Sequence, residues 1–437
     1  MSKNNKDKQF FGIGGIFFLL IVIPLSLMAF LIANGMFKLG VTIKERAVSV
    51  LDQKSQEEIK IRAINTADEV ANFLNERRKD VLTATIIPAN DIAYKQFLKD
   101  NNKNIWIKEK NKIKQISTPL YTEMALIDKT GKEVIKIAHG QTVPASKLNI
   151  VGMPSNTTYK TEEYFDKTKI LNKGEIYISP VTGWYVSKAE FEKGARFSGI
   201  IRLATPLFDK QGFAGMIVLA LDYRHLAEFT NHIIPTQQER VFEADAATGN
   251  YTFMVDGRGF VIAHPNTYHI AGINRDGTPV RALSAQNAAE LTKKGDEVLN
   301  LNQLGFMDPN LPVIAKESAA GKAGILTYKF RGLTKFVAYA PIKFYTSNLP
   351  QPAGFGWIGM GLEVEKYNEA AIKVSKNIEK EAKAWTATLI LILIASMIIL
   401  FLMMLLLARG ITRSIQAEVP AGSEGSLSFE DDDEDDK

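Results

Sequence analysis

The sequence predicts an α+β fold in which two small antiparallel modules follow one another between two membrane-spanning helices. Three observations predict it. A strand–turn–strand pattern at Ile200–Asp222 returns at Phe336–Glu363, and each copy ends on an acid. A hairpin pattern with an Asp-containing turn at Glu123–Ala138 returns at Thr252–His264. Two long uncharged segments lie near the chain ends. Because internal duplication of this kind indicates related modules, we expect two of them in tandem.

The first strand pair is built around Met216–Leu221, a nearly continuous apolar run. Such a run is expected of a central strand that is covered on both faces. Asp209, Gln211 and Gly212 supply turn chemistry before it. The run ends on Asp222, so a carboxylate is predicted at the end of a buried strand.

Composition limits the class of function. The chain has 437 residues, of which 46% are hydrophobic and 23% charged, as in ordinary globular proteins. Cysteine is absent, which excludes disulfides, thiolate metal ligands and thiol nucleophiles. The net charge is +5, and the basic residues are spread along the chain rather than gathered in one block. This distribution argues against nucleic acid as a partner.

Two segments are long and apolar enough to cross a membrane. Phe10–Ala33 and Trp385–Ala408 each contain 24 residues without a charge. Lysines precede the first segment and arginines follow the second, so both chain ends are predicted to be cytoplasmic. The first segment is longer than the apolar region of a cleaved signal peptide. The sequence thus predicts a two-pass protein of the cytoplasmic (inner) membrane with residues 35–384 outside the cytoplasm.

A long stem helix is predicted after the first span. Neither Pro nor Gly interrupts Val41–Ile87, and apolar residues recur there at helical spacing. The positions on this stripe include Ile64, Ala67, Ala71, Leu74 and Val81. One small module cannot bury so long a helix, so we expect the stripe to form the seam of a homodimer. The alternative is one face packed within the chain and one face in solvent.

The rest of the chain is divided by the same patterns. Leu226–Arg240 is predicted to be a helical connection, and Glu365–Lys383 a helix that leads into the second span. The predicted parts are a cytoplasmic N-terminus (1–9), the first span (10–33), the stem and lead-in (37–120), the first module (121–240), the second module (251–363), a juxtamembrane helix (365–384), the second span (385–408) and a C-terminal segment (409–437). The last 20 residues carry nine acids and one lysine, and we expect this tail to be disordered.

Four stretches carry a resemblance to a known family: Tyr164–Ser179, Ile201–Asp222, Tyr251–Pro265 and Phe336–Ile342. With the spans and the long first helix, they make most of the chain resemble the double Cache (dCache) sensor domain of bacterial transmembrane receptors, which has two PAS-like modules. Such domains sit on histidine kinases, diguanylate cyclases, chemoreceptors and membrane phosphatases. The resemblance implies a small ligand in the membrane-distal module, here the first. Residues 408–416 resemble the start of a HAMP linker.

The resemblance also bears on ligand chemistry. In amino-acid-binding members, an arginine before a Trp-Tyr pair grips the ligand carboxylate, and an acid at the end of the last strand grips the amino group. In this chain Glu162 stands at the arginine position, and Asp222 keeps the acid. The resemblance therefore implies a cationic or amine ligand, or no ligand, rather than an α-amino acid held in the usual way.

Six residues are candidate ligand contacts: Asp222, Tyr164, Tyr177, Trp184, Tyr185 and Arg202. The aromatic rings can wall a pocket and attract cations. Each candidate also has a structural alternative. Tyr177 could be a core residue, and Trp184 and Tyr185 a loop tip. Arg202 could pair with Asp222 or Glu162, and Asp222 could cap a helix.

Motifs for other chemistry fail their context tests. Gly354–Gly359 matches G-x-G-x-x-G but precedes a strand instead of opening a helix. None of the five histidines has the spacing of a metalloprotease site. We therefore expect no enzymatic activity, no metal and no cofactor. The predicted function is extracytoplasmic sensing of a small molecule, as the input half of a transmembrane receptor with a separate cytoplasmic output protein. The alternative is a membrane-anchored binding or assembly protein without signalling output.

Overall fold

The computed structural model describes residues 3–109, 112–330, 332–364 and 369–418 of the chain. The chain divides into two compact units. The terminal unit contains residues 1–51 and 370–437, and the other unit, which we call the sensor unit after the resemblance above, contains Asp52–Glu369. Nearly all of the predicted acidic tail, from residue 419 onward, lies outside the described residues.

Two helices form the terminal unit. α1 (Lys3–Ala84) passes from this unit into the sensor unit, and α9 covers Glu369–Glu418. Leu19–Leu39 of α1 and Ser375–Leu407 of α9 are long and apolar enough to cross a membrane, judged by length and composition. They overlap the predicted spans with shifted bounds. Neither apolar window is buried within the structure. The predicted HAMP-like start at 408–416 lies within α9, and its assignment stays a prediction.

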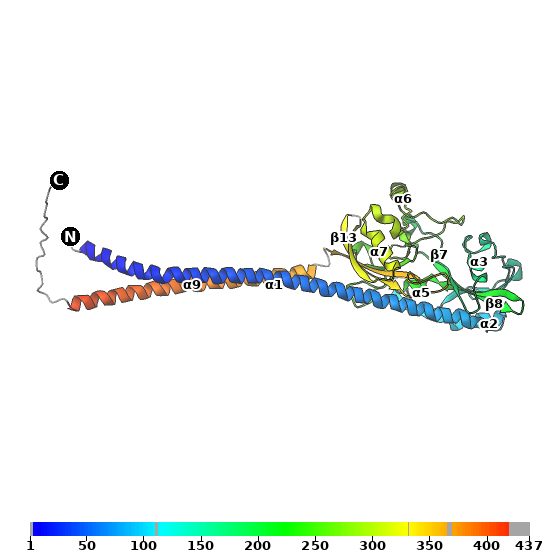
Figure 1. Ribbon diagram of the computed structural model, residues 1–437, viewed down its shortest axis with the longest axis horizontal. Coiled ribbons are helices and arrows are strands. Elements are labelled where there is room, and N and C mark those ends of the chain that lie inside the picture. The colour runs from blue at the N-terminus through cyan, green and yellow to red at the C-terminus, as the bar shows by residue number, and fades with distance from the viewer. Residues whose placement is uncertain (1–2, 110–111, 331, 365–368, 419–437) are drawn as a thin grey trace, which may run out of the picture. The chain divides into compact units, whose positions relative to one another are not determined.

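The part of α1 in the sensor unit packs one face against the sheets (Figure 1). Ala67, Ala71 and Leu74 are buried in the chain's own core, whereas Glu69 and Glu76 on the other side are exposed. The predicted dimer seam along the apolar stripe is therefore wrong, because the sheet already covers that face. A homodimer through another surface stays a prediction.

The first module is a seven-stranded antiparallel sheet. Its order is β5-β4-β3-β9-β8-β6, and the short β7 also pairs with β8. The strands are β3 (Tyr121–Asp128), β4 (Glu133–Ala138), β5 (Gln141–Thr142), β6 (Tyr177–Ile178), β7 (Thr182–Gly183), β8 (Gly199–Asp209) and β9 (Gly212–Asp222). β9 lies between β3 and β8, which confirms the predicted central strand.

Shorter elements surround this sheet. They are α2 (Asp91–Asp100), the separate hairpin of β1 (Asn102–Glu109) and β2 (Lys112–Pro119), α3 (Tyr164–Lys169), α4 (Lys188–Glu192) and α5 (Tyr223–Ala227). The lead-in to the first module is thus a hairpin. The predicted helical connection at 226–240 is wrong beyond Ala227, because turns follow and Pro235 cannot donate a backbone hydrogen bond.

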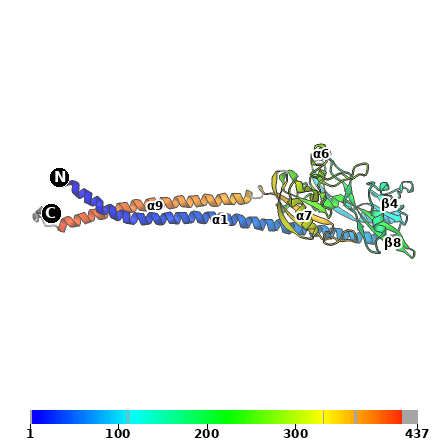
Figure 2. The same ribbon diagram turned by 45° about the horizontal axis from the view of Figure 1, so that its top comes forward.

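The second module is a five-stranded antiparallel sheet in the order β11-β10-β14-β13-β12. Its elements are β10 (Tyr251–Asp256), β11 (Val261–Ala263), α6 (Ala288–Lys294), α7 (Asn310–Ala319), β12 (Gly324–Phe330), β13 (Leu333–Ile342) and β14 (Gly356–Glu363). The 3-10 turns of the sensor unit are Ala145–Lys147, Pro154–Asn156, Ala246–Thr248, Thr267–His269 and Leu301–Phe306. The two modules lie next to one another along α1 (Figure 2). The strand pair β13–β14 corresponds to β8–β9, as predicted.

The two modules repeat in detail. In the first hairpin turn, the Asp128 carboxylate accepts the backbone N–H groups two and four residues further on, and Asp256 does the same in the second. Opposite these acids stand Gly215 and Gly356, both with positive φ. A Cβ at either glycine would collide with a carbonyl oxygen of the neighbouring strand. Both copies therefore require glycine at the same register position.

Candidate functional site

The outer face of the first sheet, turned away from α1, carries a polar cluster. Side chains alternate along a strand, so Arg202 of β8 lies on this face between buried apolar residues. Its register partner on β9 is Ala220, which is also the register partner of Glu123 on β3. Because the alanine is small, the Arg202 guanidinium reaches across it, and its Nη1 lies 2.7 Å from Glu123 Oε2.

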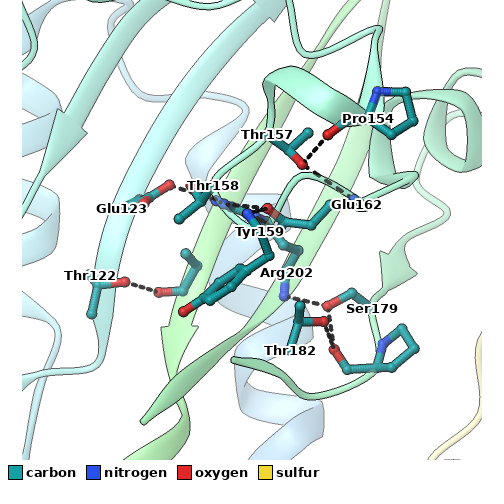
Figure 3. A network of polar contacts seen from close by, with 12 residues as sticks. Thr122, Glu123, Pro154, Thr157, Thr158, Tyr159, Glu162, Ser179, Thr182 and Arg202 are labelled. Carbon is teal, nitrogen blue, oxygen red and sulfur yellow. Dashed lines mark hydrogen bonds and ion pairs between the residues drawn. The ribbon is translucent and has the colours of Figure 1, made fainter. Parts of the chain in front are cut away.

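Arg202 is the centre of a network that we call the arginine cluster: Arg202, Glu123, Glu162 and Thr158 (Figure 3). Its Nε donates to Glu162 Oε1 at 2.7 Å, and its Nη2 donates to Thr158 Oγ1 at 3.1 Å. Its Cζ lies 5.0 Å from the centre of the Tyr164 ring. Arg202 is only 3% exposed. Charge-assisted hydrogen bonds therefore satisfy a cation that burial would otherwise disfavour.

The cluster holds Arg202 and Glu123 in the charged state. Burial lowers the pKa of the Arg202 guanidinium, but Glu123 and Glu162 more than offset this and raise it well above the usual value. Burial raises the pKa of the Glu123 carboxyl, yet Arg202 and Lys136 together lower it to about 2. Arg202 and Glu123 are therefore both ionised at neutral pH.

This arrangement decides one alternative left open by the sequence. Arg202 pairs with Glu162 and not with Asp222. Its second carboxylate partner, Glu123, was not among the predicted site residues. The only signal for it in the sequence is an acid inside the apolar pattern of the first hairpin. The contact with Arg202 depends on the register of three strands.

Asp222 ends β9 and caps α5. Its Oδ1 accepts the Arg224 backbone N–H at 2.9 Å, and its Oδ2 lies 2.7 Å from Arg224 Nη2. The helix-cap interpretation is therefore confirmed. A cationic ligand at this carboxylate would compete with the Arg224 guanidinium, and at Glu162 it would compete with Arg202. The role of Asp222 in ligand binding stays a prediction.

Trp184 and Tyr185 contact the second module. The Trp184 ring lies 5.0 Å from that of Tyr159, and Arg275 lies over its face. The Tyr185 hydroxyl accepts the Glu297 backbone N–H at 3.0 Å and donates to the Tyr268 carbonyl at 3.1 Å. These two residues thus hold the modules together and are not an exposed loop tip.

Tyr164 and Tyr177 line a cavity between the modules. Its volume is about 310 Å³. The lining of this junction cavity comprises Thr161, Glu162, Glu163, Tyr164, Tyr177, Ser179, Pro180, Val181 and Thr182 from the first module, and Arg258, Phe260, Ala271, Gly272, Ile273, Pro279 and Val280 from the second. Of the six predicted site residues, only these two tyrosines line it. Among the described residues, no three His, Asp or Glu side chains are placed to hold a metal ion.

Comparisons with known proteins agree with this architecture. The family model of the Cache domain (dCache_1) matches residues 44–362, which is more than half of the chain. Solved structures that match the chain include the ligand-binding domain of the Pseudomonas fluorescens chemoreceptor CtaA in complex with L-isoleucine, at 14% identity and a TM-score of 0.40, covering 75% of this chain and 98% of that one.

Another is the ligand-binding domain of the Pseudomonas aeruginosa PAO1 amino acid chemoreceptor PctB in complex with L-Arg, at 14% identity and a TM-score of 0.37, covering 70% of this chain and 93% of that one. No curated protein matches the chain.

Proposed function

Because this chain belongs to the Cache domain family, whose members are sensory ligand-binding modules, we propose that it senses a small molecule outside the cytoplasm as the input half of a bacterial transmembrane receptor. In this proposal the sensor unit is extracytoplasmic and both chain ends are cytoplasmic. A cytoplasmic output protein or module completes the receptor.

The observation that carries this proposal is the continuity of α1. One helix contains both a candidate membrane span and the residues that pack against the sheets of the sensor unit. Val81 and Leu74 are fully buried in that packing. A change in the sheets that moves this part of α1 therefore acts on the same helix that is proposed to cross the membrane.

Within the sensor unit, we place the ligand on the outer face of the first module. Tyr164 and Tyr177 are the predicted site residues that border open space there. The other four predicted site residues each have partners within the protein: Arg202, Asp222, Trp184 and Tyr185. In this proposal they position the site around the two tyrosines.

The proposal is tested with a chimaera. The chain is joined after Gln416 to the cytoplasmic region of a chemoreceptor, and the activity of the coupled kinase is measured in membranes. A panel of amino acids, amines, carboxylic acids and sugars is first screened for compounds that raise the unfolding temperature of the full-length chain. We expect a compound that stabilises the chain to change the kinase activity in a saturable manner. Stabilisation without any change in kinase activity would instead support a binding or assembly protein without signalling output.

A further inference from the structure

The junction cavity has polar groups that the protein leaves without partners. Tyr164 and Tyr177 are 3% and 7% exposed. Neither hydroxyl forms a hydrogen bond with any residue in the described part of the chain, and neither is among the fully buried polar atoms that lack a partner. Their residual exposure therefore includes the hydroxyl oxygens. Burial raises the pKa of both, that of Tyr177 to about 12, so each remains a donor as well as an acceptor.

The charged side chains of the cavity are already paired. Glu162 is held by Arg202, and Glu163 lies 3.6 Å from Lys167. On the other side, Arg258 Nη2 lies 2.7 Å from Asp256 Oδ2. Glu162 is buried, so a charged ligand beside it would disturb its pairing with Arg202, whereas an uncharged ligand would not. Hydroxyl groups on the ligand can donate to carboxylates and accept from tyrosine and arginine while the ion pairs stay intact.

The backbone on either side of the cavity wall at residues 179–182 is hydrogen-bonded to the second module. On one side, the Asn348 side chain of the second module binds both the N–H and the C=O of Ile178, at 3.2 and 2.8 Å. On the other, the Ile273 N–H donates to the Gly183 carbonyl at 2.9 Å, and Tyr185 N–H donates to the Ile273 carbonyl at 3.0 Å. A molecule in the cavity therefore contacts a wall that is hydrogen-bonded to the second module at both of its ends.

We propose that the junction cavity binds an uncharged, hydroxyl-rich small molecule of about monosaccharide size, which contacts both modules at once. The volume of the cavity is near the lower end of small-molecule sites, which span roughly 300–1,000 Å³. Aliphatic and aromatic walls from Val181, Phe260 and Ile273 match the C–H faces of such a molecule. The inference rests on the sensing function proposed above, and it names the class of the ligand and the place where the ligand binds.

The test uses the absence of cysteine from the chain. Thr182→Cys places a single thiol in the cavity wall, and Lys129→Cys places the control thiol on the exposed β3–β4 turn, which is not part of the cavity lining. The full-length protein is treated with methyl methanethiosulfonate in the presence of neutral probes: glucose, galactose, mannose, inositol and mannitol. At about ten times its Kd, a bound probe should slow modification of the Thr182→Cys thiol about tenfold and leave the control rate unchanged.

A second variant keeps the packing and removes one hydroxyl. Tyr177→Phe, combined with Thr182→Cys, should weaken protection by the same probe about three- to tenfold, the effect of one hydrogen bond. Failure of every neutral probe to protect the Thr182→Cys thiol would overturn the inference. So would stronger protection by gluconate or glucosamine than by any neutral probe. A compound that raises the unfolding temperature without protecting this thiol would refute the junction site while leaving the sensing function in place.

Discussion

Replacement of Arg202 by leucine should lower the free energy of unfolding of the sensor unit by about 3–5 kcal/mol, the cost of leaving buried charges without their partner. Glu123 and Glu162 are both buried, and Arg202 is the cation shared between them. Lys136, 3.5 Å from Glu123, compensates only part of the charge. The measurement is chemical unfolding of the full-length chain in detergent, followed by circular dichroism.

Two further variants separate the charge effect from the loss of packing. Adding Glu123→Gln and Glu162→Gln to Arg202→Leu removes the unpaired carboxylates and should restore part of the lost stability. Arg224→Leu is the matched control, because Arg224 also pairs with a buried carboxylate but its side chain is 51% exposed. It should cost only about 1 kcal/mol or less. Equal losses for Arg202→Leu and Arg224→Leu would contradict the central position of Arg202.

Acid should remove the contribution of Glu123 to stability. The folded-state pKa of this carboxyl is lowered from 4.5 to about 2. Below pH 4.5 the unfolded chain binds the proton first, so protonation favours unfolding until the folded form is protonated as well. The contribution of about 3 kcal/mol is therefore present above about pH 5 and is lost between about pH 5 and pH 2.

The measurement compares wild type with Glu123→Gln. The unfolding free energy is determined for both proteins from pH 7 to pH 2, and we expect the difference between them to shrink through the acid window. Curves that stay parallel over that whole range would show that Glu123 is not the titrating group.

Much of the fold could be predicted because its signals are local. Apolar runs and turn residues mark β9 and both hairpins, and the structure confirms these elements. The hairpin of β1 and β2 gave no such signal, since all of the β2 side chains are exposed or half-exposed. The apolar stripe of α1 was visible as well. Its spacing reveals one buried face but not what covers it, and the covering surface is the chain's own sheet.

The contacts of the site were harder to predict, because many of them join residues that are far apart in the sequence. Asp222 and Arg224 are two residues apart, so a local contact explains the cap and the ion pair. Arg202 and Glu123 are 79 residues apart, and they meet only because Ala220 stands between them in the sheet register. Likewise, the direction of Tyr185 depends on how the second module packs against the first. Such contacts are fixed by tertiary structure, which the local pattern does not contain.

The claim that the chain is an extracytoplasmic sensor is tested most directly by measuring on which side of the membrane the sensor unit lies. Because the chain has no cysteine, Asp276→Cys on an exposed turn and Ser414→Cys beyond the second span each supply a single reactive thiol. Both variants are treated in intact cells with a charged maleimide that does not cross the cytoplasmic membrane. We predict labelling of Asp276→Cys in intact cells, and labelling of Ser414→Cys only after permeabilisation. If Ser414→Cys were labelled in intact cells and Asp276→Cys were not, the result would contradict the proposed function.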